Sequence, residues 1–247
     1  MTYTPINTLS VLVPAYNEEA TIRNILDRLC SLELKYALHI EIVVVNDASQ
    51  DRTGQLISEY SVEHNQVTLR CHNQLYNQGK GAAIRKAIEL STGDFIVVQD
   101  ADLEYDPSEF DALLAPVIHA QADVVYGSRF IGGNPHRILF FWHSVGNKML
   151  TTLSNMFTDL NLTDMETCYK LIRGDYARSL LIRENRFGIE PEITARLSRI
   201  KGIRFYEVGI SYYGRTYAEG KKIGWRDGFR AIACILWYNI FDRKIFK

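Results

Sequence analysis

The chain has 247 residues, of which 47% are hydrophobic, so it is long enough to bury the core of one large domain. Its 28 basic and 29 acidic residues give a net charge of −1, which excludes a global field that would attract nucleic acid. We therefore expect no nucleic-acid partner. The four cysteines are far apart and show no zinc-ligand spacing, which indicates reduced thiols in a cytoplasmic protein.

Apolar runs rich in β-branched residues predict strands, and most are separated by stretches with helical periodicity. The runs are Leu9–Val13, Ile40–Val45, Val67–Arg70, Phe95–Gln99 and Val124–Tyr126. Apolar residues share one helical face between Ile22 and Leu29, and again between Ala82 and Ile88. This alternation predicts an α/β fold with a Rossmann-like, mostly parallel central sheet flanked by helices.

Polar side chains cluster directly after four of these strands. The clusters are residues 14–18, 46–53, 100–106 and 127–129. Because the carboxyl ends of parallel strands share the edge where ligands bind, we expect a site there. From about residue 135 onward the pattern changes to aromatic and basic mixtures, which we interpret as an added segment of the same domain.

Asp100-Ala101-Asp102 is the strongest single feature, because a buried strand delivers two carboxylates, followed by Glu104, to its carboxyl end. Carboxylate oxygens in this position suit Mg²⁺ or Mn²⁺ bridging a diphosphate. Such an ion would stabilise a departing nucleoside diphosphate as a Lewis acid. A solvated turn is the alternative, but the strand context favours the metal site.

The segment Pro14-Ala15-Tyr16-Asn17-Glu18 lacks the glycines that a dinucleotide or P-loop site needs. Tyr16 and Glu18 are instead placed to hold a base or a ribose. Asp47, after the second strand, is placed to accept a hydrogen bond from a base or a sugar hydroxyl. The alternative for its segment is an N-cap of the next helix, at Ser49 or Asp51.

Two cations in these clusters are candidates for phosphate contacts. Lys80 lies in Asn77–Gly81, at the start of a predicted helix, where an anion would be favoured. Arg129 follows the fifth strand, and its guanidinium fork would hold a phosphate with two hydrogen bonds. A solvated turn lysine and a surface salt bridge are the alternatives.

Together these motifs resemble family 2 glycosyltransferases of the GT-A fold. The resemblance is to the dolichol-phosphate mannose synthase-like branch, which includes dolichyl-phosphate glucosyltransferases and bacterial polyprenyl-phosphate glycosyltransferases. It runs from about Leu9 to Lys222. It rests on five segments that occur in the family's order and spacing: PAYNE, NDASQDRT, NQGKGAA, QDADLEYDP and YGSR.

The resemblance implies a site for a nucleotide-sugar donor. We expect the nucleotide to lie against Pro14, Tyr16, Glu18, Asp47, Lys80, Asp100 and Ala101. Asp102 and Glu104 would hold the metal, although many relatives have glutamine where this chain has Glu104. Residues 1–228 would form the GT-A domain, with about 135–228 as its acceptor side, and 229–247 a C-terminal amphipathic helix.

On the acceptor side, Thr163–Lys170 resembles the family's acceptor signature, and Arg215–Lys221 resembles its late phosphate loop. Arg137 lies near the place of the family's second acceptor-phosphate arginine, although its spacing to Ser144 and Asn147 does not match. The predicted catalytic residues are Asp102, Arg129, Lys221 and Arg137.

The implied activity is metal-dependent, inverting transfer of mannose or glucose from GDP-mannose or UDP-glucose to a polyprenyl or dolichyl phosphate. A phosphate monoester has a second pKa of about 6, so the attacking oxygen needs no base at neutral pH. A saccharide hydroxyl acceptor in cell-surface polysaccharide synthesis is the alternative, with Glu190, Glu192 or Asp164 as base. Glu190 and Glu192 would otherwise cap a helix at Ile193–Ile200. A third hypothesis is an inactive nucleotide-sugar-binding subunit.

Apolar and aromatic residues in two segments of the chain indicate contact with a membrane surface. They are Ile138–Trp142 and, in the tail, Phe229, Ile232, Ile235, Leu236 and Ile240. The tail would otherwise pack on the sheet, or dock a membrane-protein subunit. Met1–Ser10 shows no signal pattern and the longest apolar run, Ala231–Tyr238, is too short to span a bilayer. We expect a peripheral protein on the cytoplasmic face.

Overall fold

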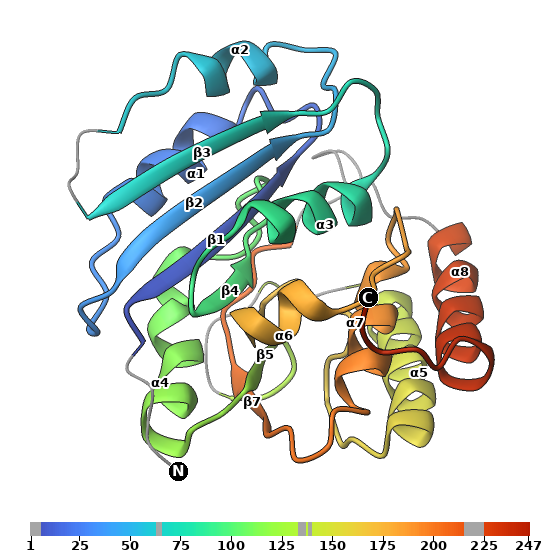
Figure 1. The fold of residues 1–247 in the computed structure, drawn as a ribbon. Coiled ribbons are helices and arrows are strands. Elements are labelled where there is room, and N and C mark those ends of the chain that lie inside the picture. Colours follow the sequence, from blue (N-terminus) through green and yellow to red (C-terminus); the bar gives the residue numbers. More distant parts are fainter. Residues whose placement is uncertain (1–5, 63–65, 133–136, 138–139, 215–224) are drawn as a thin grey trace.

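The computed structural model describes residues 6–62, 66–132, 137, 140–214 and 225–247 (Figure 1). Its centre is a seven-stranded sheet with the order β3-β2-β1-β4-β6-β5-β7. The strands are β1 Thr8–Ala15, β2 His39–Asn46, β3 Val67–Asn73, β4 Phe95–Val98, β5 Val124–Ser128, β6 Lys170–Arg173 and β7 Phe205–Gly209. Only β6 is antiparallel to its neighbours β4 and β5, so the predicted mostly parallel sheet is confirmed.

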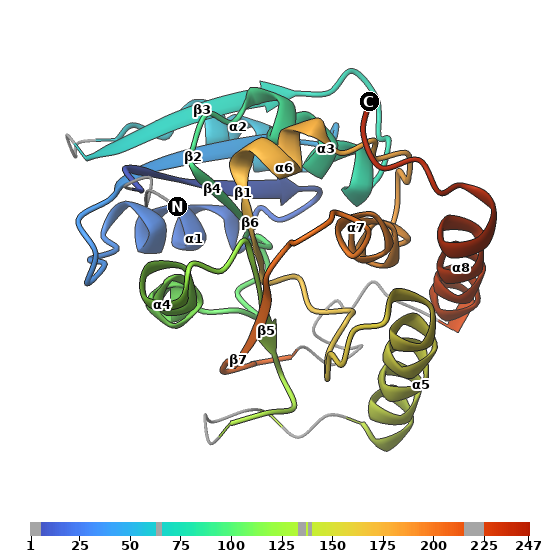
Figure 2. The same cartoon turned by 60° about the horizontal axis from the view of Figure 1, so that its bottom comes forward.

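Helices cover both faces of this sheet (Figure 2). One face carries α1 Ile22–Cys30, α2 Thr53–Ser58 and α4 Phe110–Ala120. The other carries α3 Lys80–Leu90, α5 Phe141–Thr158, α6 Gly174–Ser179, α7 Ile189–Leu197 and α8 Trp225–Leu236. A 3₁₀ turn, η1 Pro107–Glu109, precedes α4, and a π-helical turn, η3 Trp237–Phe241, extends α8.

The two covered faces explain why β1 is apolar on both faces apart from the buried Ser10. Successive side chains of a strand point to opposite faces, so Leu9 and Val11 pack on the α1 and α4 side while Leu12 packs on the α3 side. All three side chains are fully buried. Central strands covered on both faces are expected to have this pattern.

Two predicted helices have different bounds in the structure. The helix expected at Ile193–Ile200 is α7, which begins earlier and so contains Glu190 and Glu192 in its first turn. The C-terminal helix expected over residues 229–247 begins at Trp225 and ends at Phe241. Asp242 follows the last residue of this helix, and it pairs with the buried guanidinium of Arg196 at 2.9 Å.

The order of the strands places a crevice between β1 and β4. Chain order runs outward from β1 to β2 and β3 on one side, and resumes with β4 on the other. At such a switch point the loops after the two strands diverge and leave room for a ligand. The loop that begins at Tyr16 and the loop that begins at Asp100 flank this crevice.

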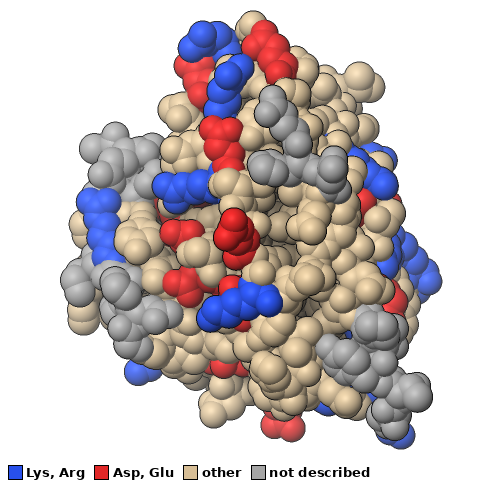
Figure 3. All heavy atoms as spheres, turned by 90° about the vertical axis from the view of Figure 1, so that its left-hand side faces the viewer, with Lys and Arg blue, Asp and Glu red and all other residues tan. Residues whose placement is uncertain are grey.

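Charged side chains of both signs are interspersed on the face drawn in Figure 3. Lysine and arginine side chains lie next to aspartate and glutamate, and neither sign forms a continuous patch there. This distribution agrees with the net charge of −1. On that face, attraction to a ligand therefore depends on local groups.

Candidate active site

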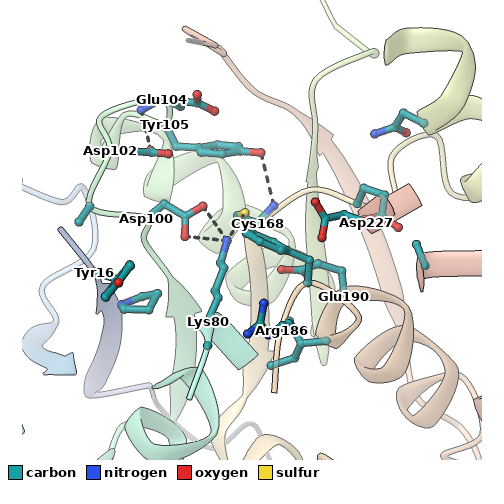
Figure 4. Close-up of a pocket in the computed structure, with 18 of the residues that line it drawn as sticks. Tyr16, Lys80, Asp100, Asp102, Glu104, Tyr105, Cys168, Arg186, Glu190 and Asp227 are labelled. Carbon is teal, nitrogen blue, oxygen red and sulfur yellow. Dashed lines mark hydrogen bonds and ion pairs between the residues drawn. The ribbon is translucent and has the colours of Figure 1, made fainter. Parts of the chain in front are cut away.

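A cavity of about 840 Å³ lies at the carboxyl edge of the sheet, large enough for a nucleotide sugar (Figure 4). Its wall brings together most of the residues predicted from sequence: Pro14, Tyr16, Glu18, Asp47, Lys80, Asp100, Ala101, Asp102, Glu104 and Arg129. They come from the loops after β1, β2, β4 and β5 and from the first turn of α3. The expected convergence of these loops is therefore observed.

Of the predicted acceptor-side cations, Arg129 lines the cavity and Arg137 does not. Arg137 Nη1 instead donates a hydrogen bond to the carbonyl of Gly214 at 3.0 Å. Lys221 lies outside the residues that the structure describes, so its predicted role stays a prediction.

Lys80 reaches from α3 to the end of β4, where it forms an ion pair with Asp100. Its Nζ lies 2.8 Å from each carboxylate oxygen and 2.9 Å from the sulfur of Cys168. Burial lowers the pKa of Lys80, but the Asp100 carboxylate outweighs burial, so this pKa is well above its usual value. Lys80 is therefore a fixed positive charge beside the predicted diphosphate position.

The loop after Asp100 presents the two predicted metal ligands. The N–H of Glu104 donates to Asp102 Oδ1 at 3.1 Å, and the hydroxyl of Tyr212 donates to Glu104 Oε2 at 2.6 Å. Between them Leu103 adopts a left-handed backbone, with φ of 64°, which turns the loop tightly.

We tested whether these residues fit a divalent ion. Among the described residues no group of three or more His, Cys, Asp or Glu side chains could hold a metal by itself. Mg²⁺, however, is commonly held by one or two carboxylates together with substrate phosphates and water. Asp102 and Glu104 fit that mode, since both line the cavity in which a diphosphate would lie.

Asp47, predicted to contact a base or a sugar, lines the cavity and is also bound by its own chain. It is buried, and each of its carboxylate oxygens already accepts two hydrogen bonds. The donors are Gln74 Nε2 and the N–H of Gln78 on one oxygen, and Asn77 Nδ2 and the N–H of Gly79 on the other. Its acceptor capacity is used, so Asp47 shapes the cavity wall by fixing the segment that leads into α3.

The N-cap position of α2 is Arg52, not Ser49 or Asp51, although Asp51 does bond to the start of the helix. Its Oδ1 accepts a hydrogen bond from the N–H of Thr53, the first residue of α2, at 2.9 Å. Ser49 instead links two loops, because its hydroxyl accepts from the N–H of Asn17 at 3.0 Å.

Arg129 lines the cavity and is held there in a bidentate ion pair. Its Nε and Nη2 donate to the two oxygens of the fully buried Asp164 at 2.6 and 2.8 Å. Burial raises the pKa of Asp164, but Arg129 outweighs burial and holds that pKa below its usual value. Asp164 is therefore ionised and committed to Arg129, which argues against its alternative role as a base.

Other residues of the wall were not predicted from the sequence, among them Arg186 and Asp227. Arg186 is exposed and belongs to a segment that crosses the first turn of α3, where the N–H of Ala82 donates to the carbonyl of Asn185 at 3.1 Å. A Cβ at Gly81 would lie 2.5 Å from the carbonyl oxygen of Glu184. Gly81 is thus required for close packing, which the sequence pattern alone did not reveal.

The wall also has an apolar part on its α5 and α8 side. The side chains concerned are Phe130, Trp142, Leu150, Phe187, Ile189 and Ala231. Phe130 of this part directly follows Arg129 in the chain. A ligand with both an anionic and a hydrocarbon portion matches such a wall.

Residues 10–181 match the family model described as glycosyl transferase family 2, and the chain belongs to this family. It is 36% identical over 217 residues to the undecaprenyl-phosphate 4-deoxy-4-formamido-L-arabinose transferase of Pseudomonas aeruginosa, covering 88% of this chain and 61% of that protein. It is 28% identical over 216 residues to the dolichyl-phosphate β-glucosyltransferase ALG5A of Trichomonas vaginalis, covering 83% and 65%. The chain thus spans less than two thirds of the length of these relatives.

The fold is also that of a solved glycosyltransferase. Glucosyl-3-phosphoglycerate synthase from Mycobacterium tuberculosis, in complex with Mn²⁺, uridine diphosphate and phosphoglyceric acid, superposes with a TM-score of 0.69 at 19% identity. The match covers 93% of this chain and 78% of that one. The predicted GT-A fold is confirmed.

Proposed function

We propose that the protein transfers a hexose, mannose or glucose, from a nucleotide-diphosphate sugar to a polyprenyl or dolichyl phosphate. The observation that carries this proposal is that one cavity gathers the carboxylates of Asp100–Glu104, the cations Lys80 and Arg129, and apolar side chains on its α5 and α8 side. The relatives named for transfer to undecaprenyl and dolichyl phosphates support the same acceptor class.

At the donor end the nucleotide would lie against Pro14, Tyr16 and Glu18, with its diphosphate between Lys80 and the loop of Asp102. Mg²⁺ or Mn²⁺ held by Asp102 and Glu104 would neutralise charge on the departing diphosphate. Lys80 is fixed by Asp100, so its charge is in place before the donor binds and needs no reorganisation.

At the acceptor end, Arg129 would hold the lipid phosphate in line with the anomeric carbon. The bond from that carbon to the diphosphate breaks as the bond to the acceptor oxygen forms, and the electron pair leaves with the diphosphate. The acceptor is a dianion at neutral pH, so no proton must be removed. One displacement inverts the anomeric configuration.

The geometry favours this acceptor over a sugar hydroxyl, which would need a base. Asp164 is bound to Arg129, and the buried carboxylate of Glu190 forms an ion pair with the buried Lys170. Glu192 is held by Arg196 at 2.6 Å. The three predicted base candidates are therefore engaged in ion pairs. An inactive subunit is less well supported, since the cavity combines donor and acceptor ends.

The direct test is transfer of label into lipid. Purified protein would be incubated with Mn²⁺ or Mg²⁺, radiolabelled UDP-glucose or GDP-mannose, and a short polyprenyl phosphate. We expect label in the organic phase with one of the two donors, dependent on the lipid and abolished by a chelator. Label that enters only water-soluble saccharides would contradict the lipid acceptor.

We further propose that α5 and α8 form a membrane-contact surface, which defines the peripheral location. No helix in the described parts of the chain is both long and apolar enough to cross a bilayer. α5 packs against α8, and both expose large apolar side chains: Phe140, Phe141, Trp142, Val145, Met149, Phe229, Trp237, Ile240 and Phe241. The buried side chains of α8, such as Ile235, pack on the core, so the proposed membrane contact would use only its exposed side chains.

The beginning of α5 is expected to enter the interface. Replacing Phe140 and Phe141, which are 52% and 70% exposed, with serine should lower partitioning onto anionic phospholipid vesicles by about tenfold or more. The matched control replaces Met156 and Phe157, 76% and 42% exposed at the far end of the same helix, with serine. Sedimentation with vesicles measures both. Equal loss in the two variants would contradict an interface confined to the first turns of α5.

A further inference from the structure

Glu166 is a carboxyl group of the cavity wall that takes no part in the proposed contacts with the nucleotide, the metal or the acceptor phosphate. Its Oε1 is buried and has no hydrogen-bond partner. In the described parts of the chain one other buried side-chain atom lacks a partner, Arg199 Nη1, and Arg199 does not line the cavity. Buried polar atoms in proteins are nearly always paired, so an unpaired acceptor in a ligand cavity indicates a group that the ligand satisfies.

In the chain, Glu166 lies between a residue at the predicted acceptor phosphate and a residue beside the predicted diphosphate. Two residues before it, Asp164 holds Arg129 at 2.6 Å, at the predicted acceptor phosphate. Two residues after it, the sulfur of Cys168 contacts Lys80 at 2.9 Å, beside the predicted diphosphate. In a direct displacement the transferred sugar must lie between these two phosphates.

The chemistry of a carboxyl group there fits a sugar and not a phosphate. A carboxylate would repel either phosphate, whereas a sugar hydroxyl is neutral and can donate or accept a hydrogen bond. Burial, with the Glu190 and Asp164 carboxylates, raises the pKa of Glu166 to about 7, against the lowering effect of Lys170 and Arg129. Both protonation states are therefore populated near neutral pH, and either can bind a hydroxyl.

We propose that Glu166 binds a hydroxyl group of the transferred sugar and thereby contributes to selection of the donor. This inference rests on the proposed function for the identity of the ligand. It makes Glu166 a specificity-determining residue of the sugar subsite, between the Arg129–Asp164 pair and the Lys80–Asp100 pair. The nucleotide itself would not touch it.

The test compares binding of a nucleotide with binding of the same nucleotide carrying a sugar. Calorimetry would use UDP with UDP-glucose and GDP with GDP-mannose, in the presence of Mn²⁺ and without acceptor. The measured quantity is the ratio of the nucleotide-sugar affinity to the affinity for the nucleotide alone. For Glu166→Ala we expect this ratio to fall by about ten- to a hundredfold, the effect of losing one hydrogen bond to a charged group. The affinity for the nucleotide alone should not change. Glu166→Gln, which keeps the shape and hydrogen-bonding capacity, should retain more of that gain.

Glu109→Gln is the matched control, because Glu109 is a carboxyl outside the cavity wall, and it should behave as the wild type. Deoxy-sugar donors extend the test. Loss of one hydroxyl should weaken binding to the wild type, while the same loss should have no further effect in Glu166→Ala.

Three results would overturn the inference, and they are distinguishable. An unchanged contribution of the sugar in both variants, with nucleotide binding intact, removes Glu166 from the sugar subsite but leaves the proposed function standing. Loss of turnover in Glu166→Gln with unchanged donor binding assigns Glu166 as a base for a hydroxyl acceptor. A wild-type protein that binds none of the four compounds overturns the proposed function and this inference together.

Discussion

Replacement of Asp102 by asparagine is expected to lower transfer of label into lipid by about 10²- to 10³-fold, the loss typical when one group that stabilises developing charge is removed. Asparagine keeps the acceptor oxygen that receives the N–H of Glu104 at 3.1 Å, so the loop should hold its shape. What it removes is the negative charge that favours a divalent ion. The remaining Glu104 is engaged by the Tyr212 hydroxyl and would hold the ion alone.

The measurement is the lipid-labelling rate over a titration of Mn²⁺ and of Mg²⁺. The variant should need far more metal for half-maximal activity, and saturating metal should restore only part of the rate. Asp106→Asn is the control, because Asp106 lies on the same loop, outside the cavity wall, and caps η1 by accepting from the N–H of Ser108. If Asp102→Asn keeps more than a tenth of the rate with the same metal dependence, Asp102 is not a metal ligand.

The parallel part of the fold was predictable from sequence because its strands are buried on both faces. β1, β2 and β4 are mostly apolar, interrupted by Ser10 in β1 and Glu41 in β2, and the structure has them at the predicted places. β6 and β7 were missed for physical reasons. β6 is four residues long and begins with a buried lysine, Lys170, and β7 is mostly half-exposed, so neither shows the apolar run of a covered strand.

The candidate site was predictable where it follows from strand ends. Asp100 and Asp102 come directly after β4, and the carboxyl edge of a parallel sheet is shared by neighbouring strands. Which of the gathered groups remain available to a ligand was not predictable. Asp47 and Asp164 carry the residue types of a ligand-binding site, but their partners fix them in the scaffold.

Residues brought in from far along the chain also escaped prediction. Arg186 reaches the cavity because its segment packs on the glycines at the start of α3, more than a hundred residues earlier in the chain. Glu166 lies within a segment that the family resemblance marked, but its unpaired oxygen is a property of packing. No local pattern reports the absence of a hydrogen-bond partner.

The second large effect is expected at the Arg129–Asp164 pair. Arg129→Lys should lower the lipid-labelling rate at low acceptor concentration by about a hundredfold, because lysine keeps the charge but loses the planar fork. The fork has two tasks in this geometry. Its Nε and Nη2 bind Asp164, and the guanidinium carbon lies 5.1 Å from the centre of the Tyr212 ring, whose hydroxyl binds Glu104.

Stability must be measured beside activity, because both partners are buried. Breaking a buried ion pair by removing one partner typically costs about 3–5 kcal/mol, and lysine should reduce this loss by keeping a positive charge near Asp164. The lowered pKa of Asp164 means that the pair stabilises the folded state above the unfolded pKa of about 4, and that this stabilisation is lost as the pH falls through the folded-state value. Assays at pH 7 therefore compare variants with Asp164 ionised.

Asp164→Asn separates orientation from charge at this pair. If Asp164 acts by orienting Arg129, Asp164→Asn should raise the acceptor KM while donor binding is unchanged, and the double variant with Arg129→Lys should lose little more than Arg129→Lys alone. Arg173→Lys is the control, since Arg173 makes a similar two-point pair with Asp175, at 2.7 and 2.8 Å, away from the cavity. Additive losses in the double variant would mean that Arg129 and Asp164 contribute separately, and unchanged KM in all variants would remove Arg129 from the acceptor site.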